Sequence, residues 1–256
     1  MKKVIIILLL SVLALPAIAQ TDEKADFSAV CPTGQVLHYK IIDYGEVNVW
    51  YSNQNPELLG GYIKVPRKVK YNDQNYLVTG IGDEAFANCI RIQGVELPTT
   101  MFYVGERAFY RCSDLRIILM PKTLTYIGAR AFEGCVSLVD VVMPNSLTEM
   151  GDYAFKDCEN IRHFVISHAL EVIPEGAFLN CRSVTDYLIP ASVTTIGCHA
   201  FDGYEQLKSV TFFGPVPPEP ECEPAFGREI PIYVIKQHFP EYKASYIWGQ
   251  YSIQEM

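Results

Sequence analysis

Apolar residues along the middle of the chain recur with a constant step of 23 residues. The most regular column is an Ala-Phe dipeptide, whose six phenylalanines are Phe86, Phe109, Phe132, Phe155, Phe178 and Phe201. A glycine precedes each alanine by three residues, except in one repeat where Pro174 takes its place. A fixed period of this length, carried by apolar columns, is typical of a solenoid in which each repeat forms one coil.

Two further apolar columns in each repeat lie two residues apart. The first consists of Val95, Ile118, Val141, Phe164, Tyr187 and Val210, and the second of Leu97, Met120, Met143, Ile166, Ile189 and Phe212. This alternation predicts one short strand per coil, hydrogen-bonded to the coils above and below. The pattern therefore predicts a β-rich solenoid, a right-handed coil of six 23-residue repeats with a parallel sheet on its concave face. Its stability is shared between the repeats and their interfaces.

The ends of the chain lack this period, and the sequence divides into four segments. Residues 1–19 combine two N-terminal lysines, an apolar run and an Ala-Ile-Ala site, which predicts a secretory signal peptide. Residues 20–77 are expected to form short strands, with a hairpin turn at residues 72–75, that cap the first coil. Residues 78–214 hold the repeats. Residues 215–256, with a late Ala225-Phe226, are expected to form a C-terminal cap of one strand and an aromatic tail.

Composition and charge indicate a folded, acidic, exported protein. Hydrophobic residues make up 49% of the chain, and the formal net charge changes from −8 to −10 when Lys2 and Lys3 are removed with the signal peptide. Such a charge repels nucleic acid and anionic lipid. No apolar run after residue 19 is long enough to span a bilayer. We expect an exported protein at the cell surface, outside the cell or in the periplasm, with no membrane-spanning segment and no nucleic-acid partner.

The cysteines divide into one repeated column and three others. The column consists of Cys89, Cys112, Cys135, Cys158 and Cys181. Stacked coils place these side chains about 4.8 Å apart and parallel, whereas a disulfide needs convergent side chains. We therefore expect a structural ladder of free, buried thiols, and no zinc site, because even spacing does not bring four thiols into a tetrahedron. Cys198 and Cys222 lie about one coil apart, and a disulfide between them that fastens the C-terminal cap is a hypothesis.

Signals for catalysis are weak. The segment from Gly80 to Ala85 resembles a dinucleotide-binding motif, but Gly82 and Ala85 belong to repeat columns and no βαβ unit follows. The sequence contains no HExxH, GxSxG, P-loop or calcium-loop pattern. We therefore expect a protein with no catalytic residues, metal or cofactor.

The repeats resemble those of a known family. The segments SLVDVVMPNSLTEMGDYAFKDC and SVTDYLIPASVTTIGCHAFDGY fit the pattern LxxVxxPxSLTxIGxxAFxxC of BspA-like leucine-rich repeats, also called the treponemal type. The resemblance covers residues 78–214 and extends more loosely to both ends. It implies a leucine-rich-repeat solenoid that acts in adhesion or interaction, with host matrix, plasma or cell-surface proteins, or other bacteria, as partners. The buried columns define the family, whereas the exposed columns select the partner.

The exposed residue between the two inward positions of each strand is a candidate for partner binding. Four consecutive repeats carry an apolar residue there, namely Leu119, Val142, Val165 and Leu188, in a stripe about 15 to 20 Å long. The columns beside the stripe carry Ile117, Asp140, His163 and Asp186, and then Arg116 and Arg162. An apolar stripe with a polar rim is typical of a protein-binding surface. The alternative is that these side chains merely suit a parallel sheet.

A carbohydrate-binding or substrate-capturing protein of the cell envelope is the alternative function. Glycan binding requires aromatic platforms, for which the nearest candidates are Tyr103, Tyr126 and Tyr187. Tyr187 lies in an inward column, and Tyr126 directly precedes the inward Ile127. The sequence therefore favours a non-catalytic protein-interaction module.

Overall fold

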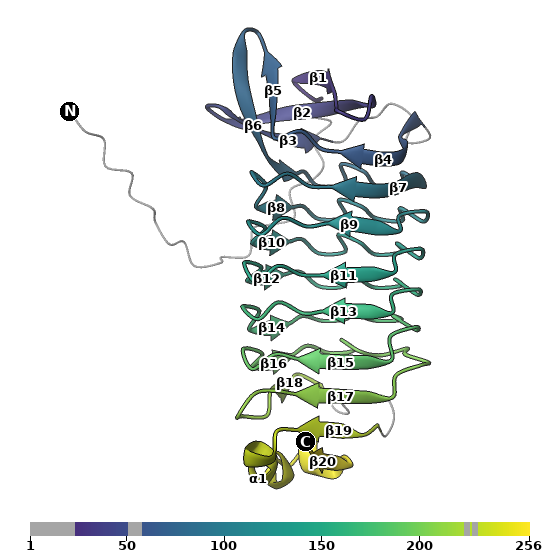
Figure 1. Cartoon of the computed structure of the whole chain (residues 1–256), viewed down its shortest axis with the longest axis vertical. Coiled ribbons are helices and arrows are strands. Elements are labelled where there is room, and N and C mark those ends of the chain that lie inside the picture. The colour runs from purple at the N-terminus through teal and green to yellow at the C-terminus, as the bar shows by residue number, and fades with distance from the viewer. Residues whose placement is uncertain (1–23, 51–57, 223–225, 227–229) are drawn as a thin grey trace, which may run out of the picture.

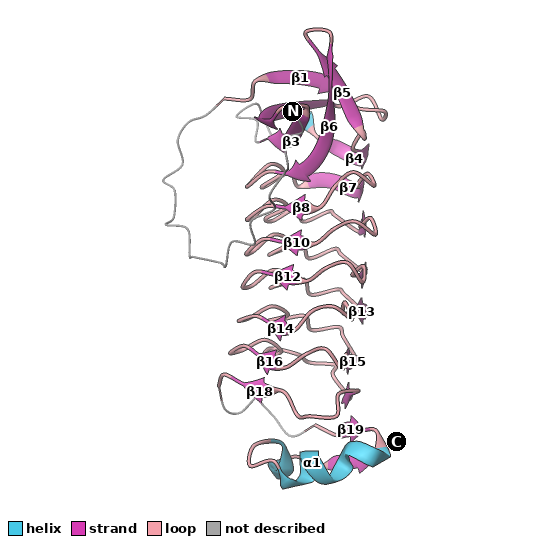
Figure 2. Cartoon of the chain, turned by 90° about the vertical axis from the view of Figure 1, so that its left-hand side faces the viewer, coloured by secondary structure: helices cyan, strands magenta, loops and turns pink. Residues whose placement is uncertain are grey.

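The computed structural model describes residues 24–50, 58–222, 226 and 230–256, which wind into a β-solenoid (Figure 1). The coils place their strands in two columns that run along the stack (Figure 2). The first column consists of β4 (Gly60–Lys64), β7 (Arg91–Glu96), β9 (Ile117–Leu119), β11 (Asp140–Val142), β13 (His163–Val165), β15 (Asp186–Ile189), β17 (Ser209–Phe212) and β19 (Ile232–Val234). The second consists of β6 (Gln74–Ile81), β8 (Tyr103–Val104), β10 (Tyr126–Ile127), β12 (Glu149–Met150), β14 (Val172–Ile173), β16 (Thr195–Ile196) and β18 (Glu219–Pro220). We call the solvent-facing side of the first column the strand face.

Both columns pair in parallel with the register that the repeat predicts. Asp140 lies opposite His163, and Asp186 lies opposite Ser209, each 23 residues further along the chain. The first column is not one continuous ladder, since its hydrogen-bonded groups are β4-β7-β9, β11-β13 and β15-β17-β19 with β20 (Ile253–Glu255). The predicted strands are thus confirmed, while the expected pairing of every strand with both neighbours is wrong between β9 and β11 and between β13 and β15.

A third ladder joins the turns that carry the Ala-Phe dipeptides. In one such turn the amides of Arg130, Phe132 and Gly134 donate to carbonyls of the next coil, each at 2.8 Å. Arg130 and Gly134 have φ angles of 56° and 76°. A left-handed conformation at these positions turns every second amide towards the same neighbour, so that the turns of adjacent coils are bonded without a strand.

The core is a column of stacked aromatic rings. The ring centroids of Phe86, Phe109, Phe132 and Phe155 are 5.0 to 5.2 Å apart along the stack. The column continues to Phe226, the phenylalanine of the late Ala-Phe dipeptide, whose ring lies 5.4 Å from that of Phe201. Such rings are buried completely and add offset stacking to the burial of their apolar area.

The stack is locally spread where Pro174 replaces the repeat glycine. Elsewhere the amide of that glycine donates to the preceding coil, at 2.8 Å for Gly151, but proline has no amide hydrogen to donate. β12 and β14 are accordingly not paired with each other, although each pairs with its other neighbour. Phe164 packs edge-on against Phe155 and Phe178, whose centroids are 6.3 Å apart.

The N-terminal cap extends the second column. β1 (Phe27–Val30), β2 (Val36–Asp43) and β3 (Glu46–Trp50) form an antiparallel meander, and β3 pairs in parallel with β6. β5 (Lys68–Tyr71) forms the expected hairpin with β6. Its turn is tighter than residues 72–75, because Asn72 and Asp73 alone connect the strands, with φ angles of 46° and 62° typical of a two-residue hairpin turn.

The C-terminal tail covers the last coil. It contains η2 (Lys236–His238), α1 (Phe239–Ala244) and η3 (Trp248–Gln250), and it ends in β20, a strand that the sequence did not indicate. Trp248 is buried, packs edge-on against Phe212, and donates from its indole nitrogen to the carbonyl of Pro218 at 2.7 Å. The tail therefore closes the hydrophobic core of the solenoid.

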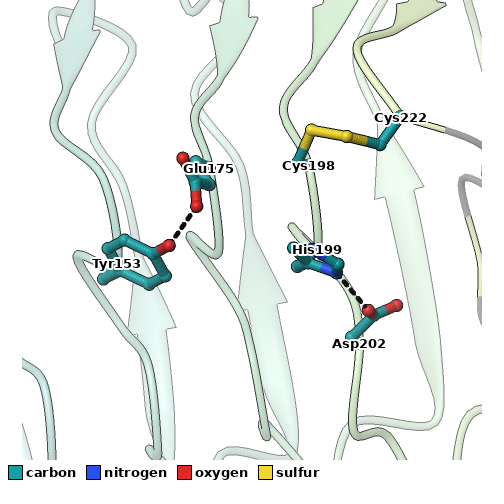
Figure 3. The surroundings of a disulfide bond; sticks show 6 residues. All are labelled: Tyr153, Glu175, Cys198, His199, Asp202 and Cys222. Atoms are coloured by element: carbon teal, nitrogen blue, oxygen red, sulfur yellow. Dashed lines mark hydrogen bonds and ion pairs between the residues drawn. A yellow bond between two sulfur atoms is a disulfide. The ribbon is translucent and has the colours of Figure 1, made fainter.

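Cys198 and Cys222 are joined by a disulfide, with their Cα atoms 5.0 Å apart (Figure 3). The five column cysteines are free and buried. From the second coil onward each thiol of this ladder donates to the carbonyl of the phenylalanine one coil earlier, as Cys135 does to Phe109 at 3.1 Å. These thiols therefore bond the coils together as well as filling the core.

The predicted signal peptide lies outside the described residues. Within the described part of the chain, no helix has the length and apolar character needed to cross a membrane.

Candidate protein-binding surface

The strand face presents the predicted apolar stripe across four consecutive coils. Leu119, Val142, Val165 and Leu188 lie on β9, β11, β13 and β15 and are 44%, 63%, 46% and 52% exposed. The residues directly before them in the same strands are buried in the core. The period of two thus divides each strand between the core and the solvent.

A polar rim borders the stripe. Asp140, His163 and Asp186 are exposed at the starts of β11, β13 and β15, and Asp186 accepts a hydrogen bond from Ser209 of the next strand. Arg116 and Arg162 are exposed one residue before β9 and β13. The structure therefore brings all of the sequence-predicted residues of this surface together on one side of the stack.

Tyr62 on β4, which the repeat pattern did not indicate, extends the surface towards the N-terminal cap. A Cβ atom on Gly94 would lie 2.7 Å from the Tyr62 ring and 2.9 Å from Ile117, so glycine leaves the space in which the ring lies beside Ile117. Tyr62 is 40% exposed and donates from its hydroxyl to Glu96 at 3.3 Å. Gly94, in a column that otherwise carries side chains, was the only sequence signal for the contact between Tyr62 and Ile117, because β4 lies outside the repeat.

The stripe ends before β17. Thr211 continues the column in register with Leu188. Its place between the inward Val210 and Phe212 predicts that it faces the solvent, but it is only 7% exposed. Its other neighbour in the row is Tyr233 of β19, so it lies enclosed between two larger side chains. The C-terminal cap therefore limits the apolar stripe to four coils.

Burial holds two of the ladder thiols in their neutral form. Burial raises the pKa of the Cys89 and Cys135 thiols to about 12, which keeps them protonated and unreactive at neutral pH. No group of three or more His, Cys, Asp or Glu residues in the described chain is arranged to hold a metal ion.

The aromatic candidates for glycan binding lie away from the stripe. Tyr187 is buried, 1% exposed, as its inward column requires. Tyr103 and Tyr126 stack on each other in the second column, with centroids 5.2 Å apart and an interplanar angle of 5°. They contribute nothing to the strand face.

Comparison with known proteins identifies the repeats and the fold. Residues 78–213 match six copies of the BspA type leucine rich repeat region. The structure is similar to a leucine-rich repeat protein of T. pallidum, at 24% identity and a TM-score of 0.62, over 78% of this chain and 83% of that one. It is also similar to a leucine-rich repeat protein from Bacteroides ovatus, at 23% identity and a TM-score of 0.53, over 78% of this chain and 58% of that one. A leucine rich cell surface protein from Faecalibacterium prausnitzii gives 22% identity and a TM-score of 0.55, over 74% of this chain and 55% of that one.

The chain thus spans a little over half the length of the last two proteins. No curated protein sequence matches it. Leucine-rich repeats generally serve as scaffolds for protein interaction rather than as enzymes, and the matched region covers more than half of the residues. The chain therefore belongs to the BspA type leucine-rich repeat family.

Proposed function

We propose that this chain is an exported, non-catalytic module that adheres to a host protein or to a protein of a neighbouring cell through its strand face. The observation that carries the proposal is the row of exposed aliphatic side chains at Leu119, Val142, Val165 and Leu188, at the same position of four consecutive coils. Scattered apolar residues are normal on a surface, whereas a contiguous apolar row with a charged rim is typical of an interaction site.

The stripe needs additional contacts to bind a partner stably. Full burial of an aliphatic side chain contributes about 1.5 to 3 kcal/mol, so covering the exposed half of four side chains contributes about 3 to 6 kcal/mol. Association costs about 4 kcal/mol or more in lost translational and rotational freedom. The partner must therefore also contact the rim and Tyr62, and a standard interface of about 800 Å² on each side would span several coils.

Export is the second part of the proposal. It rests on the signal-peptide pattern of residues 1–19 and is supported by the F. prausnitzii relative, which is described as a cell surface protein. An exported solenoid meets matrix proteins, plasma proteins and the surface proteins of other cells, which are the partners that we propose.

The test measures the binding of residues 20–256 to purified matrix, plasma and cell-surface proteins. The same measurement is made on a Val142→Asp, Val165→Asp variant. We expect the variant to bind about 100-fold more weakly, because two half-exposed valines are lost and two carboxylates must be desolvated in the interface. Val36→Asp with Val172→Asp is the matched control, since these valines are 49% and 45% exposed and lie on β2 and β14, away from the strand face. All proteins are first compared by circular dichroism. If the stripe variant binds as tightly as the wild type, or if no protein of the panel binds, the proposal is wrong.

A further inference from the structure

A pocket of about 280 Å³ lies where the N-terminal cap meets the first coil. The side chains that line it are Ile42 of β2, Asn48 and Trp50 of β3, Asp83 of the turn after β6, and Phe102 and Tyr103 at β8. These residues lie on the second strand column and its extension into the cap, whereas the apolar stripe lies on the first column.

The tyrosine stack of the second column ends at the pocket, with Tyr103 as its last ring. One face of the Tyr103 ring is covered by Tyr126 of the following coil. The other face is directed towards β6, where the residue in register with Tyr103 is Gly80, which has no side chain. On the far side of Gly80 the paired residue is Asn48, whose carboxamide oxygen lies only 2.6 Å from the place of a Cβ on Gly80. The Asn48 carboxamide therefore takes the place of a side chain on Gly80, and both Asn48 and Tyr103 line the pocket, which we call the slot.

Trp50 and Phe102 supply the remaining aromatic surface. A Cβ on Gly82 would lie 2.9 Å from the Trp50 ring, so this glycine lets the indole lie directly against the backbone of the first coil. Phe102 also lines the pocket, and its side chain is 44% exposed. Three aromatic side chains thus border a space large enough for one six-membered ring with its substituents.

A fixed carboxylate stands at the edge of the slot. One oxygen of Asp83 accepts hydrogen bonds from the Tyr103 hydroxyl at 3.0 Å and from the Glu106 amide at 2.8 Å. Burial, and next the charge of Asp83, raise the pKa of Tyr103 above its ordinary value, so the tyrosine remains the donor. This arrangement holds the carboxylate in one orientation, with a second oxygen that can accept further hydrogen bonds.

We propose that this pocket binds a neutral pyranose unit of a glycan. The C–H face of the sugar ring stacks on Tyr103, because the negative face of an aromatic ring attracts polarised C–H groups. Sugar hydroxyls at the ring edge donate to Asp83 and exchange hydrogen bonds with the Asn48 carboxamide. The carboxylates of Asp83 and Glu106 disfavour uronic and sialic acids. A phenylalanine side chain of a peptide could stack in the same slot, but it has no hydroxyl groups to donate to the second oxygen of Asp83 or to exchange hydrogen bonds with the Asn48 carboxamide.

The affinity for one sugar unit is expected to be about millimolar, given the small number of atoms that the pocket can enclose. The probes are neutral gluco-, manno-, galacto- and N-acetylglucosamine oligosaccharides, with uronic-acid oligosaccharides and a phenylalanine dipeptide for comparison. Binding to residues 20–256 is measured by saturation-transfer NMR and by tryptophan emission. Trp50 and the buried Trp248 are the two tryptophans of the chain, so a ligand in the slot should change the emission of Trp50. Trp50→Phe should abolish that change.

Two substitutions test the site without removing core residues. Phe102→Ala removes a rim ring, and Asp83→Asn keeps an acceptor for Tyr103 and Glu106 while it removes the charge. We expect at least one neutral oligosaccharide to bind, and each substitution to weaken binding about tenfold or more. Tyr246→Ala removes an 82% exposed ring from the C-terminal cap and should have no effect. The Val142→Asp, Val165→Asp variant should also bind glycan normally, which separates this site from the strand face.

The proposal is overturned if no neutral oligosaccharide binds at about 10 mM. It is equally overturned if Phe102→Ala and Asp83→Asn bind like the wild type, or if the acidic sugars or the dipeptide bind better.

Discussion

Replacing Gly128 by alanine should destabilise the solenoid, although a glycine-to-alanine change at an unstrained position stabilises a protein by about 0.4 to 1 kcal/mol. A Cβ on Gly128 would lie 2.6 Å from the amide nitrogen of Glu106 and 2.6 Å from the carbonyl carbon of Gly105, in the preceding coil. Ordinary contact begins at 3.4 Å. Both neighbouring atoms belong to the backbone, so no side chain can rotate away and the two coils must separate.

The cost has two parts. Forcing an extra carbon into a packed interface costs about 1 to 3 kcal/mol. Separation of the coils also weakens the 2.8 Å hydrogen bond from the Gly128 amide to the carbonyl of Val104, whose net contribution is about 0.5 to 1.5 kcal/mol. We therefore expect a loss of about 3 kcal/mol, which lowers the unfolding temperature of a chain of this size by about 6 to 12 °C.

The assay is thermal and urea unfolding followed by circular dichroism, with Gly214→Ala as the matched control. Gly214 has no left-handed φ, and a Cβ there would meet its nearest neighbour, the carbonyl of Val216, at 3.4 Å. This control should unfold within about 0.5 kcal/mol of the wild type. If Gly128→Ala is as stable as the wild type, close approach of the coils is not the reason for the glycine column.

Two other predictions concern the cysteines. Cys198→Ser with Cys222→Ser should lower the free energy of unfolding by about 3 kcal/mol, because the disulfide closes a loop with a sequence separation of 24. If peptide mapping of the unreduced protein finds both thiols free, the disulfide does not exist and this prediction is wrong. The ladder thiols should resist alkylation near neutral pH until the chain unfolds, because burial raises the pKa of Cys89 and Cys135 to about 12. Since these folded-state values exceed the ordinary value of 9.0, the unfolded chain loses these protons first as the pH rises. These groups should therefore leave the free energy of unfolding unchanged below pH 9.0 and lower it between pH 9.0 and about 12. An unfolding temperature that stays constant over that range would contradict the raised pKa of the buried thiols.

The repeated features of the fold were predictable because the repeat occurs in six copies. Each column of the repeat meets its own copy in the next coil, so the residue types predicted the buried columns, with Thr211 beside the C-terminal cap as an exception. The exposed position of Val142 and Val165 followed from the same alternation. The stacking of Phe132 between Phe109 and Phe155 followed from the constant step.

Features that occur once were not predictable in this way. Gly80 belonged only to an apparent dinucleotide motif and Gly82 to that motif and the glycine column, and neither pattern indicated that the two glycines leave space for Asn48 and Trp50 of the cap. The cap lies outside the period, so no column indicated which of its residues meet the first coil. The spread at Pro174 likewise depends on a lost amide donor together with an inserted Phe164 ring, a combination that occurs in a single repeat.

The most direct test of the proposed adhesion is photocrosslinking from the strand face to a bound partner. Benzoylphenylalanine replaces Val142 or Val165 in separate variants, and Val36 or Val172 in two controls that are similarly exposed on other surfaces. Each variant is irradiated with a matrix, plasma or cell-surface protein that binds the wild type. Binding through the strand face predicts covalent adducts from positions 142 and 165 and none from positions 36 and 172. Adducts from the controls alone would place the partner elsewhere on the solenoid and contradict the account.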